Sequence, residues 1–304
     1  MAADEKTIRV GRYEVKITNL PKVLFPRDGI TKQDLIEYYQ RIATWMLPHL
    51  RDRPLALERY PDGIEKQSFF QKEAAAYYPE WIERVTVKKV GGTVRHVVCN
   101  NGATLVYLAN QACITPHMWL SRVEKLNYPD QMVFDLDPSR DDFDAVKETA
   151  RSIGELLEKL DLPAYLKTTG SRGLHIAVPL KQEEDFDAVR GFARQVAEIV
   201  VGLAPNERTM EQRKEKRRGR VFLDVNRNAY AQHMAAAYAV RARAGAPVSG
   251  PLEWKELDRK DLRPDGVTIR SVFERVEKLG DVWKDFARRA VSLKKARKRL
   301  ESLS

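Results

Sequence analysis

The middle third of the chain alternates short apolar runs with longer segments of helical periodicity, and this order constrains the fold more than any other feature. The short runs have strand length and are residues 132–137, 164–168, 174–180 and 221–225. Apolar residues recur at helical spacing in 142–160 and in 186–203. This β-α-β-β-α-β order is that of the ferredoxin-like split βαβ fold. We therefore expect both helices on one sheet face, the other face open, the first and third strands central, and the fourth beside the first.

Strand parity predicts that acidic side chains gather on the open face. Side chains alternate between the two faces of a strand. Asp135 and Asp137 therefore lie on one face of the strand 132–137, and its apolar residues lie on the other face. In their own strands, His175 and Asp224 likewise lie on the face that the apolar residues do not occupy. One alternative is an ordinary solvated face with scattered carboxylates. Three carboxylates close together, however, repel one another unless a cation lies among them.

An Asp-x-Asp pair with a third aspartate on a neighbouring strand forms an all-oxygen site. Such sites suit Mg²⁺ or Mn²⁺, and two such ions can activate an attacking hydroxyl and neutralise a leaving pyrophosphate. Asp135 and Asp137 would bridge both ions, and Asp224 would complete the ion that activates a primer 3′-hydroxyl. The turn 169–173 (TGSRG) can present N–H and hydroxyl donors to phosphate.

Positive charge is available for a phosphate substrate. The chain has 304 residues and a formal net charge of +10, which attracts phosphate backbones but also fits a merely basic protein. Arg172, Arg227 and Arg241 are candidate triphosphate contacts, because guanidinium pairs with phosphate bidentately. The run 213–220 (RKEKRRGR) is a candidate nucleic-acid contact, or a solvated loop. The alternative for Arg172, Arg227 and Arg241 is that each is a solvated surface charge without a ligand.

Cysteine content and hydropathy indicate a cytoplasmic protein. There are two cysteines, which form no disulfide framework, and no apolar run is long enough to span a bilayer. His96, Cys99, Cys113 and His117 have spacing similar to that of zinc ligands. The apolar stretch between the cysteines (GATLVYLAN) favours a structural core instead.

Several motifs together resemble a known family. The three strongest are FDLDPS (134–139), TTGSRGLHIAVPL (168–180) and VFLDVNRN (221–228). They resemble the archaeo-eukaryotic primase superfamily and, more closely, the polymerase domain of bacterial and archaeal ligase D of non-homologous end joining. The likeness continues through NLPKVLFPRDGITK (19–32), RPLALERYPDG (53–63), SFFQKE (68–73), LANQACITPH (108–117) and VTIRSVFERVEKLGDVW (267–283).

The resemblance implies an α+β primase-polymerase fold, with the ferredoxin-like (RRM-like) core elaborated by an N-terminal α/β part. We expect a single catalytic domain over 1–304, in a stand-alone or excised form. Its parts would be an N-terminal part with DNA-end contacts (1–130), the metal-binding core (131–228) and a C-terminal helical and strand extension (229–304).

The implied activity is template-directed addition of NTPs or dNTPs to primer 3′ ends, using two Mn²⁺ or Mg²⁺ ions. The implied substrate is DNA with a 5′-phosphorylated gap or overhang, with ribonucleotides favoured. Ku and a separate DNA ligase are the implied protein partners.

Carried over by position, the resemblance assigns roles to individual residues. Asp135, Asp137 and Asp224 match the metal ligands, and Lys22 and Lys32 match the pair that holds the 5′-phosphate. The positions around the incoming nucleotide are Phe69, Phe70, His117, Thr169, Arg172, His175, Arg227, Arg241 and Arg59. Three residues depart from the family pattern: Thr169 replaces a common serine, Arg172 replaces a common lysine, and Glu58 is more acidic than expected.

Other functions fit the same fold. A primase that starts chains de novo, or a metal nuclease, would use the same carboxylates. A non-catalytic module that binds DNA ends would need only the basic residues.

Overall fold

The computed structural model describes residues 5–302 and divides into two compact units. Unit 1 comprises the described part of 1–119 together with 233–249 and 267–278. Unit 2 comprises 120–232, 250–266 and the described part of 279–304. Each unit thus combines segments that are distant in the sequence. The predicted division at about 130 and 228 follows chain order and stays a prediction.

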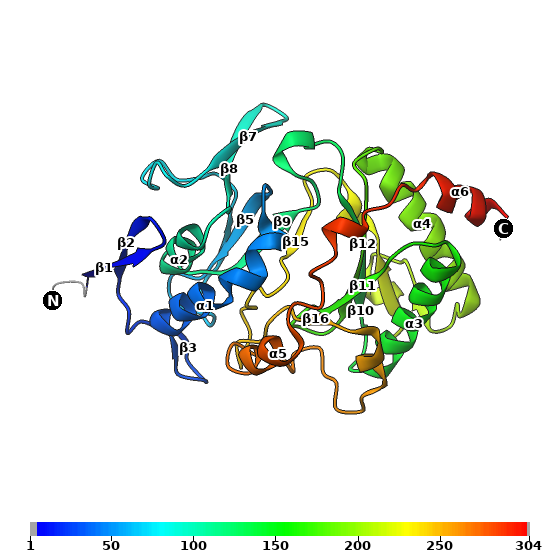
Figure 1. Cartoon of the computed structure of the whole chain (residues 1–304). Coiled ribbons are helices and arrows are strands. Elements are labelled where there is room, and N and C mark those ends of the chain that lie inside the picture. Colours follow the sequence, from blue (N-terminus) through cyan, green and yellow to red (C-terminus); the bar gives the residue numbers. More distant parts are fainter. Residues whose placement is uncertain (1–4, 303–304) are drawn as a thin grey trace. The chain divides into compact units, whose positions relative to one another are not determined.

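Unit 2 is built on a six-stranded sheet with the order β13-β14-β10-β12-β11-β16 (Figure 1). β13 is parallel to β14, and the other neighbouring strands are antiparallel. The four inner strands have the predicted arrangement, with β10 and β12 central and β14 beside β10. The strands of this sheet are β10 Gln131–Asp137, β11 Tyr165–Thr168, β12 Leu174–Pro179, β13 Arg208–Thr209, β14 Val221–Asp224 and β16 Pro251–Leu252.

Two long helices cover one face of this sheet, and a third lies near the C-terminus. α3 (Phe143–Lys159) begins after Asp142, whose carboxylate accepts a hydrogen bond from the backbone N–H of Ala145 at 3.0 Å. α4 (Phe186–Leu203) begins after Asp185, which caps the helix in the same way through Ala188. α6 spans Lys294–Glu301. Sequence periodicity predicted α3 and α4 to within a residue or two.

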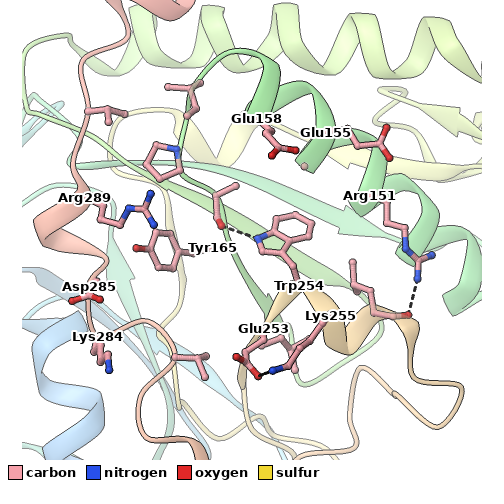
Figure 2. A pocket seen from close by; sticks show the side chains of 18 of the residues that line it. Arg151, Glu155, Glu158, Tyr165, Glu253, Trp254, Lys255, Lys284, Asp285 and Arg289 are labelled. Carbon is pink, nitrogen blue, oxygen red and sulfur yellow. Dashed lines mark hydrogen bonds and ion pairs between the residues drawn. The ribbon is translucent and has the colours of Figure 1, made fainter.

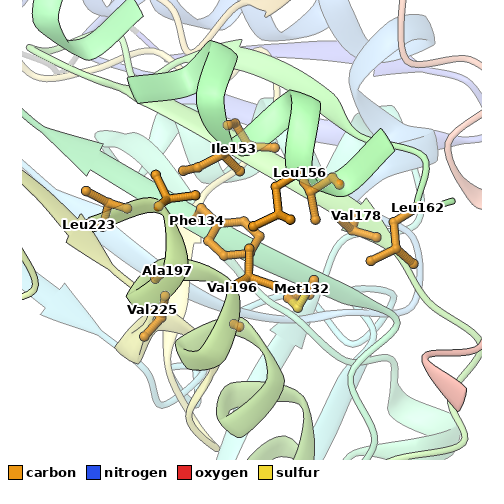
Figure 3. Packing of buried hydrophobic residues seen from close by; sticks show 14 of the residues in the cluster. Met132, Phe134, Ile153, Leu156, Leu162, Val178, Val196, Ala197, Leu223 and Val225 are labelled. Carbon is orange, nitrogen blue, oxygen red and sulfur yellow. The ribbon is translucent and has the colours of Figure 1, made fainter. Parts of the chain in front are cut away.

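The core of unit 2 confirms the parity argument. Phe134 of β10, Val178 of β12 and Leu223 of β14 are buried in one apolar cluster with α3 and α4 (Figure 3). The apolar side of the three central strands therefore faces the helices. Asp135 and Asp224, at the intervening positions, are left on the other face.

Unit 1 contains a six-stranded sheet in which five strands follow the order β15-β9-β5-β8-β7 and the sixth, β6, pairs with β5. Two separate hairpins, β1-β2 and β3-β4, complete its strands. These strands are β1 Glu5–Val10, β2 Tyr13–Thr18, β3 Val23–Phe25, β4 Ile30–Thr31, β5 Pro54–Arg59, β6 Phe69–Gln71, β7 Arg84–Lys89, β8 Gly92–Val98, β9 Cys113–Trp119 and β15 His233–Ala235. The helices are α1 Lys32–Leu50, α2 Gly102–Asn110 and, apart from its last residue, α5 Val272–Leu279.

Residues 8–18 alternate between apolar and polar side chains, which by itself predicts one strand, but the segment is a hairpin. Gly11 has φ 59° at the turn between β1 and β2, a backbone region that glycine adopts without steric cost. α1 begins after Thr31, whose side chain forms a reciprocal capping box with Asp34. Within residues 5–302, no helix is long and apolar enough to cross a membrane.

The residues with zinc-like spacing contact protein groups in the structure instead of forming a metal site. Cys99 and Cys113 are buried and free, and the thiol of Cys99 lies 3.7 Å from the carbonyl of Asn101. His96 Nδ1 lies 2.9 Å from the carbonyl oxygen of Leu55. Burial raises the pKa of both thiols, which keeps them protonated and disfavours metal binding.

Candidate active site

The register of β14, β10 and β12 brings the predicted carboxylates together. Asp135 lies directly opposite Asp224 on one side and His175 on the other. His175 Nε2 is 3.1 Å from Asp135 Oδ1. Arg227 Nε is 3.5 Å from Asp135 Oδ2 and 3.6 Å from Asp224 Oδ2. Asp135 and Asp224 therefore point toward the same guanidinium group, and Asp137 follows two residues along β10 on the same face.

The electrostatics of the three carboxylates differ. Burial alone raises the pKa of Asp135, but His175 and Arg227 outweigh it and lower the pKa to about 2. Burial and the neighbouring Asp135 raise the pKa of Asp137 to about 6, although Arg172 opposes this. Burial, with a contribution from Asp135, also raises the pKa of Asp224. Asp137 and Asp224 thus lack sufficient positive charge to stabilise their ionised forms.

No group of three or more His, Cys, Asp or Glu side chains within 5–302 has the arrangement of a formed metal site. The guanidinium of Arg227 is the positive charge that faces Asp135 and Asp224 instead. The donor chemistry nevertheless fits a hard divalent cation, because the carboxylates offer only oxygen. Burial and repulsion from Asp135 raise the pKa of Asp137 and of Asp224, so a further cation near them would stabilise their ionised forms.

The turn between β11 and β12 is held against β10. The hydroxyl of Thr169 accepts hydrogen bonds from the backbone N–H groups of Ser171 (3.2 Å) and Gly173 (3.1 Å). A Cβ on Gly173 would lie 1.8 Å from the carbonyl oxygen of Leu136, so only glycine fits there. The close approach is consistent with the effect of Arg172, whose charge lowers the pKa of Asp137.

The basic run 213–220 divides into exposed and structural residues. Arg217 is 8% exposed, donates to the carbonyl groups of Glu211 and Gln212, and stacks 3.6 Å from the ring centre of Phe222. Arg220 donates to three backbone carbonyls. These arginines therefore fold the loop before β14, and Arg217 also contributes positive charge to Asp137 and Asp224.

In unit 1, a hairpin places the two predicted phosphate-binding lysines beside each other. The backbone N–H of Lys32 donates to the carbonyl of Lys22 at 2.8 Å. Lys32 is the first residue of α1 and is 6% exposed, whereas Lys22 is more exposed and pairs with Asp62 at 2.7 Å. Burial, followed by repulsion from Lys22 and Arg59, lowers the pKa of Lys32 to about 8. A buried lysine repelled by two cations suits an anionic ligand.

The remaining predicted nucleotide contacts of unit 1 lie on β5, β6 and β9, and on the segment after β15. Phe69 and Phe70 are 45% and 50% exposed, so neither is a core residue. The ring of Phe70 packs against His117 and His233, with centroids 5.1 and 5.4 Å away. The guanidinium of Arg59 lies 5.3 Å from the ring centre of Phe69.

Arg59 and Arg241, the two predicted arginine contacts of unit 1, have different surroundings. Arg59 donates to the carbonyl of Gln111 and to the side chain of Gln71. Arg241 lies in the segment after β15, and its charge contributes to the lowered pKa of Glu58. Glu58 itself lies 3.1 Å from His117.

Sequence reasoning assigned no role to three residues near the predicted site. Lys167 is fully buried and its charge lowers the pKa of Asp135. The side chain of Asn228 bonds to both backbone groups of Val133, at 2.7 and 2.8 Å, and so fixes the turn after β14 to β10. Glu58 stood out only as a departure from the family pattern. Strand parity contained a signal for Lys167, since it alternates with the apolar Leu166.

A cavity of about 1250 Å³ lies elsewhere in unit 2, at the edge strand β16 (Figure 2). Trp254 lies at its centre, with its indole N–H bonded to the carbonyl of Ala164 at 2.8 Å. Its charged lining is largely paired, as in Lys255 with Glu253 and Arg151 with Asp258. Among the described residues, none predicted for the active site lines this cavity, so the cavity is separate from the carboxylate face.

The sheet, its two covering helices and the carboxylates on the open face define a protein of the primase-polymerase class. The family model described as "LigD, primase-polymerase domain" matches residues 31–283. The chain therefore belongs to the LigD primase-polymerase domain family.

Individual relatives agree with this assignment. The multifunctional non-homologous end joining protein LigD of Mycolicibacterium smegmatis is 34% identical over 275 residues, which is 89% of this chain and 36% of that protein. The bifunctional LigD of Bacillus subtilis is 31% identical over 277 residues, covering 90% of this chain and 44% of that protein. The polymerase domain of Mycobacterium tuberculosis ligase D, solved in complex with DNA, matches with a TM-score of 0.86 and 30% identity over 91% of this chain and 99% of that chain.

The chain spans less than half the length of these curated relatives. The expected α+β primase-polymerase fold and the resemblance to ligase D polymerase domains are confirmed. Membership of the family implies a metal-dependent nucleotidyltransferase. The comparisons do not favour the de novo primase, the nuclease or the non-catalytic module.

Proposed function

We propose that the chain is a template-directed polymerase that extends primer 3′ ends and fills gaps at 5′-phosphorylated DNA ends in non-homologous end joining. The observation that carries the proposal is the register of β14, β10 and β12, which directs Asp135 and Asp224 toward one guanidinium and leaves Asp137 on the same face. Family membership supports the assignment to end joining, and the DNA complex of the mycobacterial neighbour supports a DNA substrate.

The proposed roles follow the surroundings of each residue. Asp135, Asp137 and Asp224 would hold two Mn²⁺ or Mg²⁺ ions, which when bound activate the 3′-hydroxyl and neutralise the departing pyrophosphate. His175 holds Asp135 in orientation and ionised form through their 3.1 Å contact. Arg172 and Arg227 supply positive charge for the triphosphate. In the free protein, the guanidinium of Arg227 lies near both Asp135 and Asp224.

The residues of unit 1 would bind the ends of the substrate. Lys22 and Lys32 bind the 5′-phosphate of the downstream strand, since both cations are adjacent and Lys32 is partly desolvated. Phe70, half-exposed above two imidazole rings, offers a stacking surface for a base, with Phe69 beside it on β6. The proposed nucleotide contacts also include His117, Arg59 and Arg241 of unit 1 and Thr169 of unit 2. Ku and a separate ligase are the proposed protein partners.

Extension of a gapped duplex tests the proposal. The wild-type chain, with Mn²⁺ and either NTPs or dNTPs, should extend the primer faster when the downstream strand carries a 5′-phosphate. Asp137→Asn should reduce extension by roughly a thousandfold or more, because metal stabilisation of the transition state is worth several kcal/mol. Asp187→Asn is the matched control, since it removes an exposed carboxylate from α4. Normal extension by the Asp137 variant would contradict the site assignment.

A further inference from the structure

Glu58 places a half-buried carboxylate among the proposed nucleotide contacts of unit 1. Its Oε2 lies 3.1 Å from Nε2 of His117, and its Oε1 accepts a hydrogen bond from the hydroxyl of Tyr60 at 2.8 Å. Its side chain is 16% exposed. Glu58 lies directly opposite Phe70 in the β5–β6 pair, so the carboxylate and the aromatic ring share one face of the sheet.

The surroundings of Glu58 keep it ionised. Burial raises the pKa of this carboxyl group, but hydrogen bonding and charge from His117, the Tyr60 hydroxyl and the charge of Arg241 lower it to about 2. His233 also faces this cluster, through its ring contacts with Phe70 and His117. An anion therefore lies in contact with His117 and within electrostatic reach of Arg241, which are two of the groups of unit 1 that we assign to the nucleotide.

We propose that Glu58 is a resident anion that competes with the phosphates of the incoming nucleotide for His117 and Arg241, and thereby sets the nucleotide affinity of this chain. The inference rests on the proposed function and deepens it. A phosphate that approaches either group must displace the carboxylate or bind against its repulsion. In both cases, the negative charge of Glu58 weakens nucleotide binding and leaves the reacting atoms untouched.

A different role for Glu58 would be to orient the imidazole of His117 through the 3.1 Å contact. The two roles predict opposite effects of mutation. Glu58→Gln keeps the size and a hydrogen-bonding oxygen but removes the charge, whereas Glu58→Leu removes both. If Glu58 only orients His117, the glutamine variant binds nucleotide like the wild type and the leucine variant binds more weakly. If Glu58 is a competing anion, both variants bind more tightly.

The test is equilibrium binding of ATP, and separately of inorganic tripolyphosphate, to the full chain at fixed Mg²⁺ and salt, measured by calorimetry. We expect both Glu58 variants to bind each ligand at least about tenfold more tightly, since repulsion between unit charges about 4 Å apart corresponds to roughly fivefold in affinity in water and roughly a thousandfold near a protein surface. Glu14→Gln removes the same charge from an exposed position of strand β2 in unit 1 and should leave both affinities unchanged. Melting temperatures establish that each variant is folded.

The outcomes separate this inference from the proposed function. Unchanged or weaker binding by Glu58→Gln overturns the competing-anion role, whatever the leucine variant does. An equal gain in the Glu14 control also overturns it, because the effect would then come from net charge. His117→Ala should bind ATP more weakly than the wild type. If it binds equally well, the proposed nucleotide site in unit 1 fails, and this inference fails with it.

Discussion

Replacing Asp137 with asparagine should stabilise the folded chain while it abolishes primer extension. Burial and the adjacent Asp135 raise the pKa of Asp137 from 3.8 to about 6. A shift of about two units corresponds to about 3 kcal/mol at 1.36 kcal/mol per unit, which is the cost of ionising the group in the folded state at neutral pH. Burial of the asparagine amide offsets part of this gain. We expect stabilisation by about 1–3 kcal/mol, or roughly 2–10 °C in melting temperature.

The pH dependence identifies the source of this gain. Because the folded state holds the Asp137 proton more tightly than the unfolded state, the wild type loses stability as pH rises through the interval between 3.8 and about 6. The advantage of the asparagine variant should therefore be full at pH 7.5 and fall to about a third at pH 4.5.

Urea denaturation at both pH values measures the difference, with Asp187→Asn as an exposed control expected to stay within about 0.5 kcal/mol of the wild type. A destabilised Asp137 variant, or a gain of the same size at both pH values, would refute this reasoning.

Three further predictions concern other parts of the proposed site. Affinity for a 5′-phosphorylated end should fall as pH rises from 7 to 9, because the pKa of Lys32 is about 8 and its charge is lost in that range; Lys32→Arg should remove this dependence in gel shifts. Phe70→Ala should weaken ATP binding about tenfold, since stacking on a base is worth about 1–3 kcal/mol; its melting temperature should not change, and unaltered ATP affinity would exclude stacking. Asn228→Ala leaves the backbone N–H and carbonyl of Val133 without the Asn228 side chain as partner, and should lower the free energy of unfolding by about 2–4 kcal/mol in urea titrations. A loss under about 1 kcal/mol would mean that water replaces the amide.

The carboxylate face could be predicted from the sequence because it depends on a local rule. Alternation along β10 separates Asp135 from Phe134, and one register shared with β14 then brings Asp224 opposite Asp135. The order of strands followed from the helical segments between them. These features need only periodicity and chain order.

The remaining parts of the site depend on contacts that periodicity does not determine. The position of Arg227 between two carboxylates depends on the short 3-10 helix Asn226–Asn228, whose turn is fixed by the bonds of Asn228 to Val133. The pairing of Glu58 with His117 depends on the register of two strands that are distant in the sequence. Periodicity alone does not predict the 8–18 hairpin, because a single glycine at the turn hardly disturbs the alternation of its two strands.

The basic run 213–220 shows the same limit. Its composition suggested a surface for nucleic acid, but Arg217 and Arg220 are used to fold the loop through backbone carbonyls. Charge counts cannot distinguish an arginine that binds a ligand from one that binds its own loop.

Direct measurement of Mn²⁺ binding tests the central claim that the acidic face of unit 2 holds the catalytic cations. Electron paramagnetic resonance, in the presence of a non-hydrolysable nucleotide, counts the bound Mn²⁺ ions without relying on turnover. We predict two ions per wild-type chain and fewer in both Asp137→Asn and Asp224→Asn, with no loss in Asp187→Asn. Equal Mn²⁺ binding by all four proteins would contradict the account.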